Sequence, residues 1–220
     1  MEIINRSISV EELKEIFTEL GDYKRIRKLT IDKQKEGLAG NLFEELSEYA
    51  RAKSDEEKID ALCDIFVFTA NTMPHTDHKI KNKDKFMYPM VVYDKDPKEI
   101  PLARIAGGVV LILREEAEII RMNLLETCLK AMYNLGYDPV KAMKETIKEI
   151  SSRKGHWDDK IKKFVKDPGV YSEKELEDVS LCVEYDEKKN KFLVTDIEGR
   201  YHWYVDKWYK ADYKSCKLHG

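Results

Sequence analysis

Residues 61–70, ALCDIFVFTA, would form a helix that is apolar on almost every side, with Asp64 in the middle of it. A helix of this kind is normally buried, and burying an ionised carboxylate without a partner is very costly. Asp60 lies one turn earlier on the same face. The fold must therefore supply a counter-charge, either from Arg or Lys side chains of another helix or from a divalent cation.

A second group of acids precedes this helix. The segment from about residue 36 or 41 to 53 predicts a helix on which Glu44, Glu45 and Glu48 share one stripe. A solvated acidic face would give the same pattern. However, Glu44 and Glu45 have no lysine four residues later, so the three glutamates repel one another. A bound cation would relieve this repulsion.

Carboxylates without cysteine are the hard ligands that suit Mg²⁺, with Mn²⁺ as an alternative. Mg²⁺ commonly completes its coordination with waters and substrate phosphates. Residues 44–64 carry eight acids against three bases, and residues 144–166 carry eight bases against four acids. This separation suits a metal and a polyphosphate, although scattered surface charge would look similar. We therefore expect a phosphate-bearing substrate.

Composition narrows the class of protein. The chain has 220 residues, of which 42% are hydrophobic and 37% charged, which indicates a globular protein with one domain or one domain and an appendage. The net charge of −3 favours neither nucleic acid nor a membrane as a partner. The four cysteines form no CxxC pair and the start does not resemble a signal peptide, so we expect a cytoplasmic location.

Helix-capping residues mark most of the first 155 residues. Ser9 or Ser7 is expected to cap a helix over about 10–20, ended by Gly21. Ser54, with Glu57 at the third helical position, predicts a capping box that opens the helix carrying Asp64, which ends near residue 72.

Two further helices are expected after an irregular insertion at about 74–104, which contains four prolines. A long apolar helix is predicted from about 108 to 135, followed by Gly136 as its C-cap. A last helix should begin at Asp138-Pro139 and run to about residue 152. The long helix has apolar residues on more than one face, which favours a homodimer or higher homo-oligomer with a shared bundle.

The C-terminal region has a different pattern. In VSLCVEYDEKKNKFLVTD, β-branched and aromatic residues flank a polar turn, which predicts a small β-hairpin, and RYHWYVDKWY adds a candidate third strand. We therefore expect a mainly α fold, with a helical core over residues 1–155 and a C-terminal α+β extension over 156–220.

Three segments together resemble a known family. These are EELSEY (44–49), DALCDIFVF (60–68) and NLGYDPVKAMKETIKEISSRKG (134–155), and they are similar to the MazG-like members of the all-α NTP pyrophosphatase superfamily, which also contains dimeric dUTPases and phosphoribosyl-ATP pyrophosphohydrolases. The resemblance covers about half the chain, roughly 37–73 and 110–155. It implies a MazG-like helical bundle that cleaves a nucleoside triphosphate to the monophosphate and pyrophosphate with Mg²⁺.

The resemblance also implies roles for individual acids. Glu45, Glu48 and Asp64 match metal ligands of the family, and Glu44 matches a glutamate that orients or deprotonates water. Many members have an ExxD pattern, whose first position is Ala61 in this chain. Asp60 would then serve as the fourth ligand from one residue earlier.

Other residues complete the predicted site. Glu57 also fits the bare ExxD pattern, but its place in the first helical turn favours capping. Asn71 lies on the acid stripe, where an amide could contact a base or sugar, or serve the helix end. Arg153 and Lys154 could bind phosphates or belong to solvated surface.

We therefore expect a Mg²⁺-dependent nucleoside triphosphate pyrophosphohydrolase with a homo-oligomeric bundle. The base is left open, between a narrow substrate such as dUTP or dCTP, a broad range of NTPs and dNTPs, and phosphoribosyl-ATP. The alternative is a helical nucleotide-binding or regulatory protein without turnover.

Overall fold

The computed structural model describes residues 7–76, 90–91, 102–153, 155–161, 163–166, 170–171, 181–186, 188–189, 191–196, 202–207 and 209–218. The chain divides into two compact units, one of residues 1–147 with 211–220 and the other of residues 148–210. The predicted C-terminal extension covers residues 156–220 as one region. In the structure residues 211–218 belong with the helical unit, because they bond to it.

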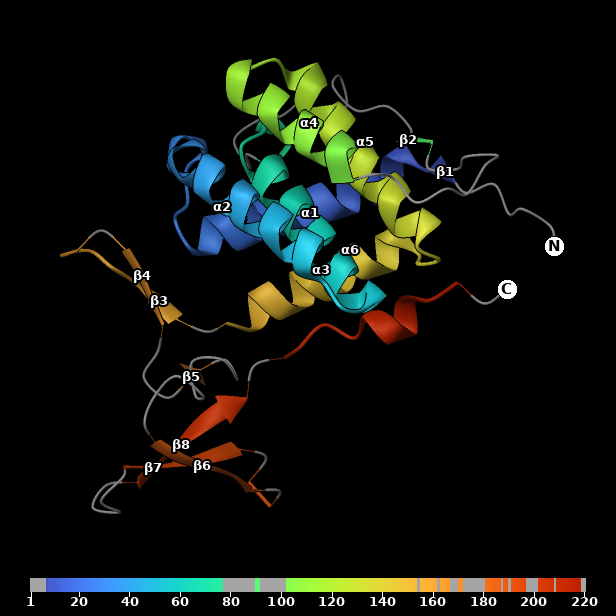
Figure 1. Ribbon diagram of the computed structural model, residues 1–220. Helices are drawn as coiled ribbons and strands as arrows, with labels where there is room; N and C mark the ends of the chain where they lie inside the picture. Colours follow the sequence, from blue (N-terminus) through green and yellow to red (C-terminus); the bar gives the residue numbers. More distant parts are fainter. Residues whose placement is uncertain are drawn as a thin grey trace. The chain divides into compact units, whose positions relative to one another are not determined.

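The first unit is mainly helical, as expected (Figure 1). Its helices are α1 (Val10–Ile26), α2 (Ile31–Arg51), α3 (Asp55–Asn71), α4 (Leu102–Arg114), α5 (Glu118–Asn134) and most of α6 (Pro139–Ser152). Short elements complete it: β1 (Ser7–Ile8) antiparallel to β2 (Met90–Val91), and the 3₁₀ turns η1 (Pro74–Thr76) and η3 (Tyr213–Cys216). Residues 77–89 and 92–101, most of the predicted insertion, lie outside the described residues.

Three helix starts occur where the capping residues predicted them. Ser9 accepts a hydrogen bond from the Glu12 backbone N–H, and Ser54 caps α3 through the Glu57 N–H. Asp138 Oδ1 accepts from the backbone N–H of Val140, with Pro139 as the first helical residue of α6. These local contacts explain why the starts of the helices were predictable.

The expectation that Gly21 ends the first helix is wrong. α1 continues to Ile26, and Gly21 is buried within it. A Cβ at this position would lie 3.1 Å from the Thr76 carbonyl oxygen. The glycine therefore allows η1 to approach α1 closely, which is a tertiary constraint and not a helix stop.

The predicted long helix over 108–135 is also wrong, because the structure has two helices there. α4 ends at Arg114, and α5 begins after Ala117, which provides no side-chain cap. Arg121 Nη1 donates to the Glu116 carbonyl oxygen at 2.7 Å and so satisfies a backbone group at the break.

Folding these residues into a helical hairpin buries apolar surface inside one chain. Ile105, Val109 and Ile112 of α4 are buried, and Val110 and Leu111 remain exposed. Apolar residues on several faces of this segment therefore no longer require a second copy of the chain to bury most of them.

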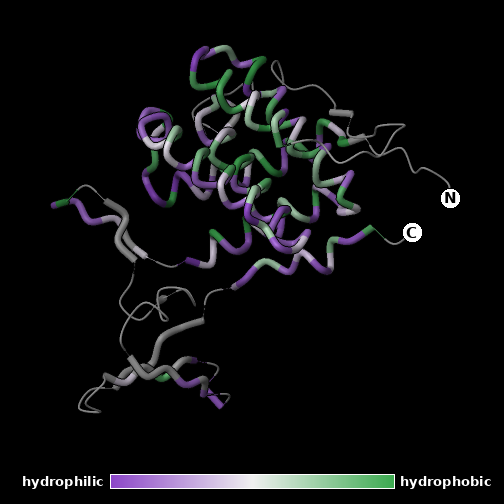
Figure 2. Tube along the Cα trace, viewed as in Figure 1, coloured by the Kyte–Doolittle hydropathy of each residue, from purple (hydrophilic) through white to green (hydrophobic). Residues whose placement is uncertain are grey.

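α3 is the centre of the first unit, because it contacts α1, α2, α5 and η3. Its Ile59, Leu62, Ile65 and Phe66 are fully buried, and the Phe66 ring lies 6.2 Å from that of Phe17 on α1. Figure 2 shows the apolar residues of α3, α4 and α5 in green within the bundle. No described helix is long and apolar enough to cross a membrane.

The second unit contains strands. β3 (Gly155–Asp158) pairs antiparallel with β4 (Lys163–Lys166). A four-stranded sheet has the order β5-β8-β7-β6, formed by Val170–Tyr171, His202–Lys207, Lys191–Asp196 and Leu181–Asp186. β6 and β7 are antiparallel, with Asp186 opposite Lys191, and β5 runs parallel to β8.

The packing of α4 on α5 can be tested at two adjacent glycines. A Cβ on Gly108 would lie 2.8 Å from Leu124 Cδ1, whereas a Cβ on Gly107 would have nothing within 4 Å. We expect Gly108→Val to lower the free energy of unfolding by about 1–3 kcal/mol and Gly107→Val to change it little. Denaturant unfolding of both variants measures this, and equal stabilities would contradict the hairpin.

Candidate acidic site on α2 and α3

The acidic residues lie where α2 and α3 are joined. Only residues 52–54 connect the two helices, and α2 and α3 are in extensive contact with each other. A connection this short makes helices antiparallel neighbours. The second half of α2, with Glu44, Glu45 and Glu48, therefore lies beside the first half of α3, with Asp60 and Asp64.

Glu45 is the most buried acid of this group, with 8% of its surface exposed. Its pKa is raised from the usual 4.5 to about 8, first by burial and then by the negative charges of Glu48, Asp60 and Glu44. The structure thus brings together four of the five predicted acids. Three are on α2, the buried Glu45 and the exposed Glu44 and Glu48, and the fourth is Asp60 on α3. At neutral pH this arrangement favours a protonated Glu45.

Asp60 and Asp64 differ in their surroundings. Asp60 is exposed, but its Oδ1 accepts a 2.7 Å hydrogen bond from the Tyr213 hydroxyl of η3. Asp64 is half-buried, although the residues on either side of it in α3 are buried. Burial raises the pKa of the neighbouring Cys63 thiol, and the charges of Asp60 and Asp64 add to this effect. The buried residues on either side of Asp64 confirm the predicted burial of this helix, and Asp64 lies at its edge.

These acids fit a hard divalent cation by donor type. Among the described residues, no three His, Cys, Asp or Glu side chains are close enough as arranged to hold a metal ion. The donors are nevertheless all carboxylate oxygens, which Mg²⁺ prefers. A cation beside Glu45 would also offset the repulsion that raises the pKa of this residue. Binding one ion would require these carboxylates to come closer together than they are in this arrangement.

Asn71, a predicted substrate contact, is the last residue of α3 and is only 2% exposed. Its backbone carbonyl accepts from Lys24 Nζ at 2.8 Å, so Lys24 caps this end of α3. Seven residues separate Asn71 from Asp64, about 10 Å along the helix. The Asn71 side chain is therefore packed inside the protein at the C-terminal end of α3.

Three predicted residues remain: Arg153, Lys154 and Glu57. Arg153 belongs to the second unit, where its Nη2 pairs with Glu149 at 3.2 Å. Lys154 lies outside the described residues. Glu57 accepts a hydrogen bond from the Lys53 backbone N–H, which agrees with the expected capping role.

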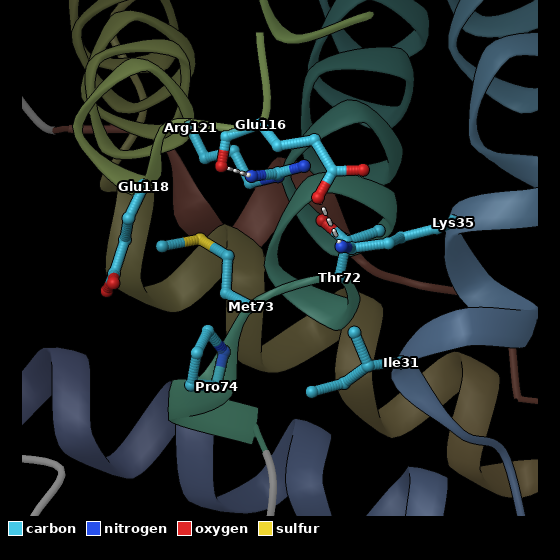
Figure 3. Close-up of a pocket in the computed structure, with 8 residues that line it drawn as sticks. All are labelled: Ile31, Lys35, Thr72, Met73, Pro74, Glu116, Glu118 and Arg121. Carbon is cyan, nitrogen blue, oxygen red and sulfur yellow. Dashed lines mark hydrogen bonds and ion pairs between the residues drawn. The ribbon is translucent and has the colours of Figure 1, made fainter.

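A pocket that the sequence did not predict lies at the other ends of these helices. It has a volume of about 180 Å³. Lys35 pairs with the Glu116 carboxylate at 2.8 Å, and Arg121 lies beside them, 6% exposed (Figure 3). The lining consists of Ile31, Lys35, Thr72, Met73, Pro74, Glu116, Glu118 and Arg121. None of the predicted site residues is among them.

The pocket and Tyr213 had no usable signal in the sequence. Lys35 lies ten residues before Glu45, about 15 Å along α2, and its partner Glu116 lies in the break between α4 and α5. Tyr213 is 153 positions from Asp60. Pairing across such separations depends on tertiary packing.

Comparison of the chain with protein-family models, with curated proteins and with solved structures finds no match in any of the three.

The raised pKa of Glu45 predicts how stability depends on pH without divalent metal. Unfolded Glu45 loses its proton near 4.5, and the folded state keeps it to about 8. Between these values the native state binds more protons, so stability falls as pH rises, and the loss is complete above about 8. We expect Glu45→Gln to remove this loss and to raise the Tm at pH 8 by about 2–4 °C for each kcal/mol regained.

Thermal unfolding from pH 4 to pH 9 in a chelator measures this difference. Glu36→Gln, at an exposed position on the same helix, is the control and should follow the wild type. Parallel Tm curves for Glu45→Gln and the wild type would contradict the assignment.

Proposed function

We propose that this protein is a Mg²⁺-dependent nucleoside triphosphate pyrophosphohydrolase with a MazG-like helical core. The observation that supports this most is the surroundings of Glu45. It is a buried carboxyl with a pKa of about 8, next to three other acids on two paired helices. Such a concentration of negative charge costs stability and is typical of a functional site.

Two further observations support the same activity. The acids occupy the positions at which EELSEY and DALCDIFVF resemble the family, and the first unit is mainly helical. The GYDP sequence that forms part of the resemblance makes the turn between α5 and α6, with Gly136 in the left-handed region at φ 85°. The segments that carry the resemblance therefore lie on α2, on α3 and from the end of α5 through α6.

In this proposal Glu45, Glu48, Asp60 and Asp64 hold Mg²⁺. The bound ion supplies positive charge against the phosphates and lowers the pKa of a nearby water. Binding of the cation would ionise Glu45, because the cation would replace the proton that burial favours.

Glu44 is exposed beside the cluster and accepts a proton from the attacking water as a general base. The water oxygen bonds to the α-phosphorus, and the bond from this phosphorus to the bridging oxygen breaks. The products are the nucleoside monophosphate and pyrophosphate.

The exposed apolar residues of the helical unit support the further proposal that it forms a homodimer. Phe43, Val110, Leu111 and Ile119 are each about half exposed. Contact with a second copy would remove this apolar surface from water.

The activity is tested by pyrophosphate release with Mg²⁺ from NTPs, dNTPs including dUTP and dCTP, and phosphoribosyl-ATP. We expect release from at least one of these and a loss of about 10²–10³-fold in kcat for Asp64→Asn, because an electrostatic stabiliser of the transition state is removed. Glu36→Gln, the exposed control on α2, should keep wild-type activity.

The alternative outcomes are distinct. Nucleotide binding without release would favour a regulatory nucleotide-binding protein, which the Ala61 departure also permits. Release that is unchanged in Asp64→Asn would contradict the proposed metal ligands.

A further inference from the structure

We propose that Tyr213 is a positioning residue of the metal site, which the C-terminal segment 211–218 brings to Asp60. This role rests on the proposed function, because it concerns the same group of carboxylates. It adds a residue, and a part of the chain, that the α2–α3 motifs do not contain.

The contact is short and shielded. The Tyr213 hydroxyl donates to Asp60 Oδ1 at 2.7 Å, and Tyr213 is only 7% exposed. Thr146 Oγ1 of α6 lies 2.9 Å from the same phenol oxygen. A phenol that donates to a carboxylate forms a charge-assisted hydrogen bond. The bond therefore restrains the Asp60 carboxylate in a direction set by α6 and η3.

Several bonds hold the segment that carries Tyr213. The Asp138 N–H donates to the Cys216 carbonyl at 2.8 Å, and the Leu218 N–H donates to the Gly136 carbonyl at 2.8 Å. These bonds attach the segment to the α5–α6 turn, and Figure 1 shows η3, in red, next to α6.

Two contacts of side chains add to this attachment. Lys217 pairs with Glu56 in the first turn of α3 at 2.9 Å, and the Asp212 N–H donates to Glu145 at 3.0 Å. The position of Tyr213 is thus determined from α3, from α6 and from the turn between α5 and α6.

This attachment matters because Asp60 is exposed. An exposed aspartate samples several rotamers, and fixing it on binding costs conformational entropy. A partner that holds a ligating carboxylate in place removes part of this cost, and loss of such a partner typically weakens metal affinity or activity by 10–100-fold. The C-terminal segment therefore prepares Asp60 for the cation.

The test measures binding of Mn²⁺ alone to the full chain, together with pyrophosphate release. The variants are Tyr213→Phe, Asp60→Asn and the two combined, with Tyr23→Phe as control, because the Tyr23 ring contacts Arg27 on α1. We expect Tyr213→Phe to weaken Mn²⁺ binding about 10–100-fold. In the Asp60→Asn background it should have no further effect, since Tyr213 acts through Asp60.

A general loss of packing would not produce this dependence on Asp60. Unchanged Mn²⁺ affinity in folded Tyr213→Phe, or losses that add in the double variant, would overturn the positioning role and leave the proposed function standing. If Tyr213→Phe does not fold, Thr146→Val replaces it, and the same dependence on Asp60 is required. A wild type that neither binds Mn²⁺ nor releases pyrophosphate overturns the proposed function, and this role with it.

Discussion

Burial of α3 is the constraint on which the rest of the structure depends. Its apolar residues require neighbours on several sides, which α1, α2, α5 and η3 provide. The helix also carries Asp60 and Asp64, which cannot be placed in the core without a cost. The fold resolves this by turning the acids to the edge of the helix, beside the acids of α2.

The consequence is an electrostatic conflict at Glu45. Burial and three neighbouring acids raise the pKa of Glu45 to about 8, so the folded chain either keeps a proton there or gains a cation. The same conflict makes the stability of the fold depend on pH. The C-terminal segment, although distant in sequence, also contributes to this region, because Tyr213 donates a hydrogen bond to Asp60.

The parts of the fold that were predicted from sequence depend on local interactions. The caps Ser9, Ser54 and Asp138 bond to N–H groups two or three residues away, so they can be identified without knowledge of the fold. The error at Gly21 has the opposite cause. There the close approach of the Thr76 carbonyl, 55 positions away, explains the glycine. In the 108–135 segment the helix breaks at residues 115–117, where Arg121 bonds the Glu116 carbonyl.

The sequence alone determined that acids lie on two successive helices, one of them largely apolar, because periodicity and apolar patterning follow from the order of residues. Only the tertiary structure decided which acid carries the highest cost. The spacing of Glu45 in the sequence would allow a surface position. The fold instead buries it near the negative charges of Glu48 and Asp60. The pairing of Tyr213 with Asp60 was likewise decided by packing, because desolvation and hydrogen bonding depend on which surfaces meet in space.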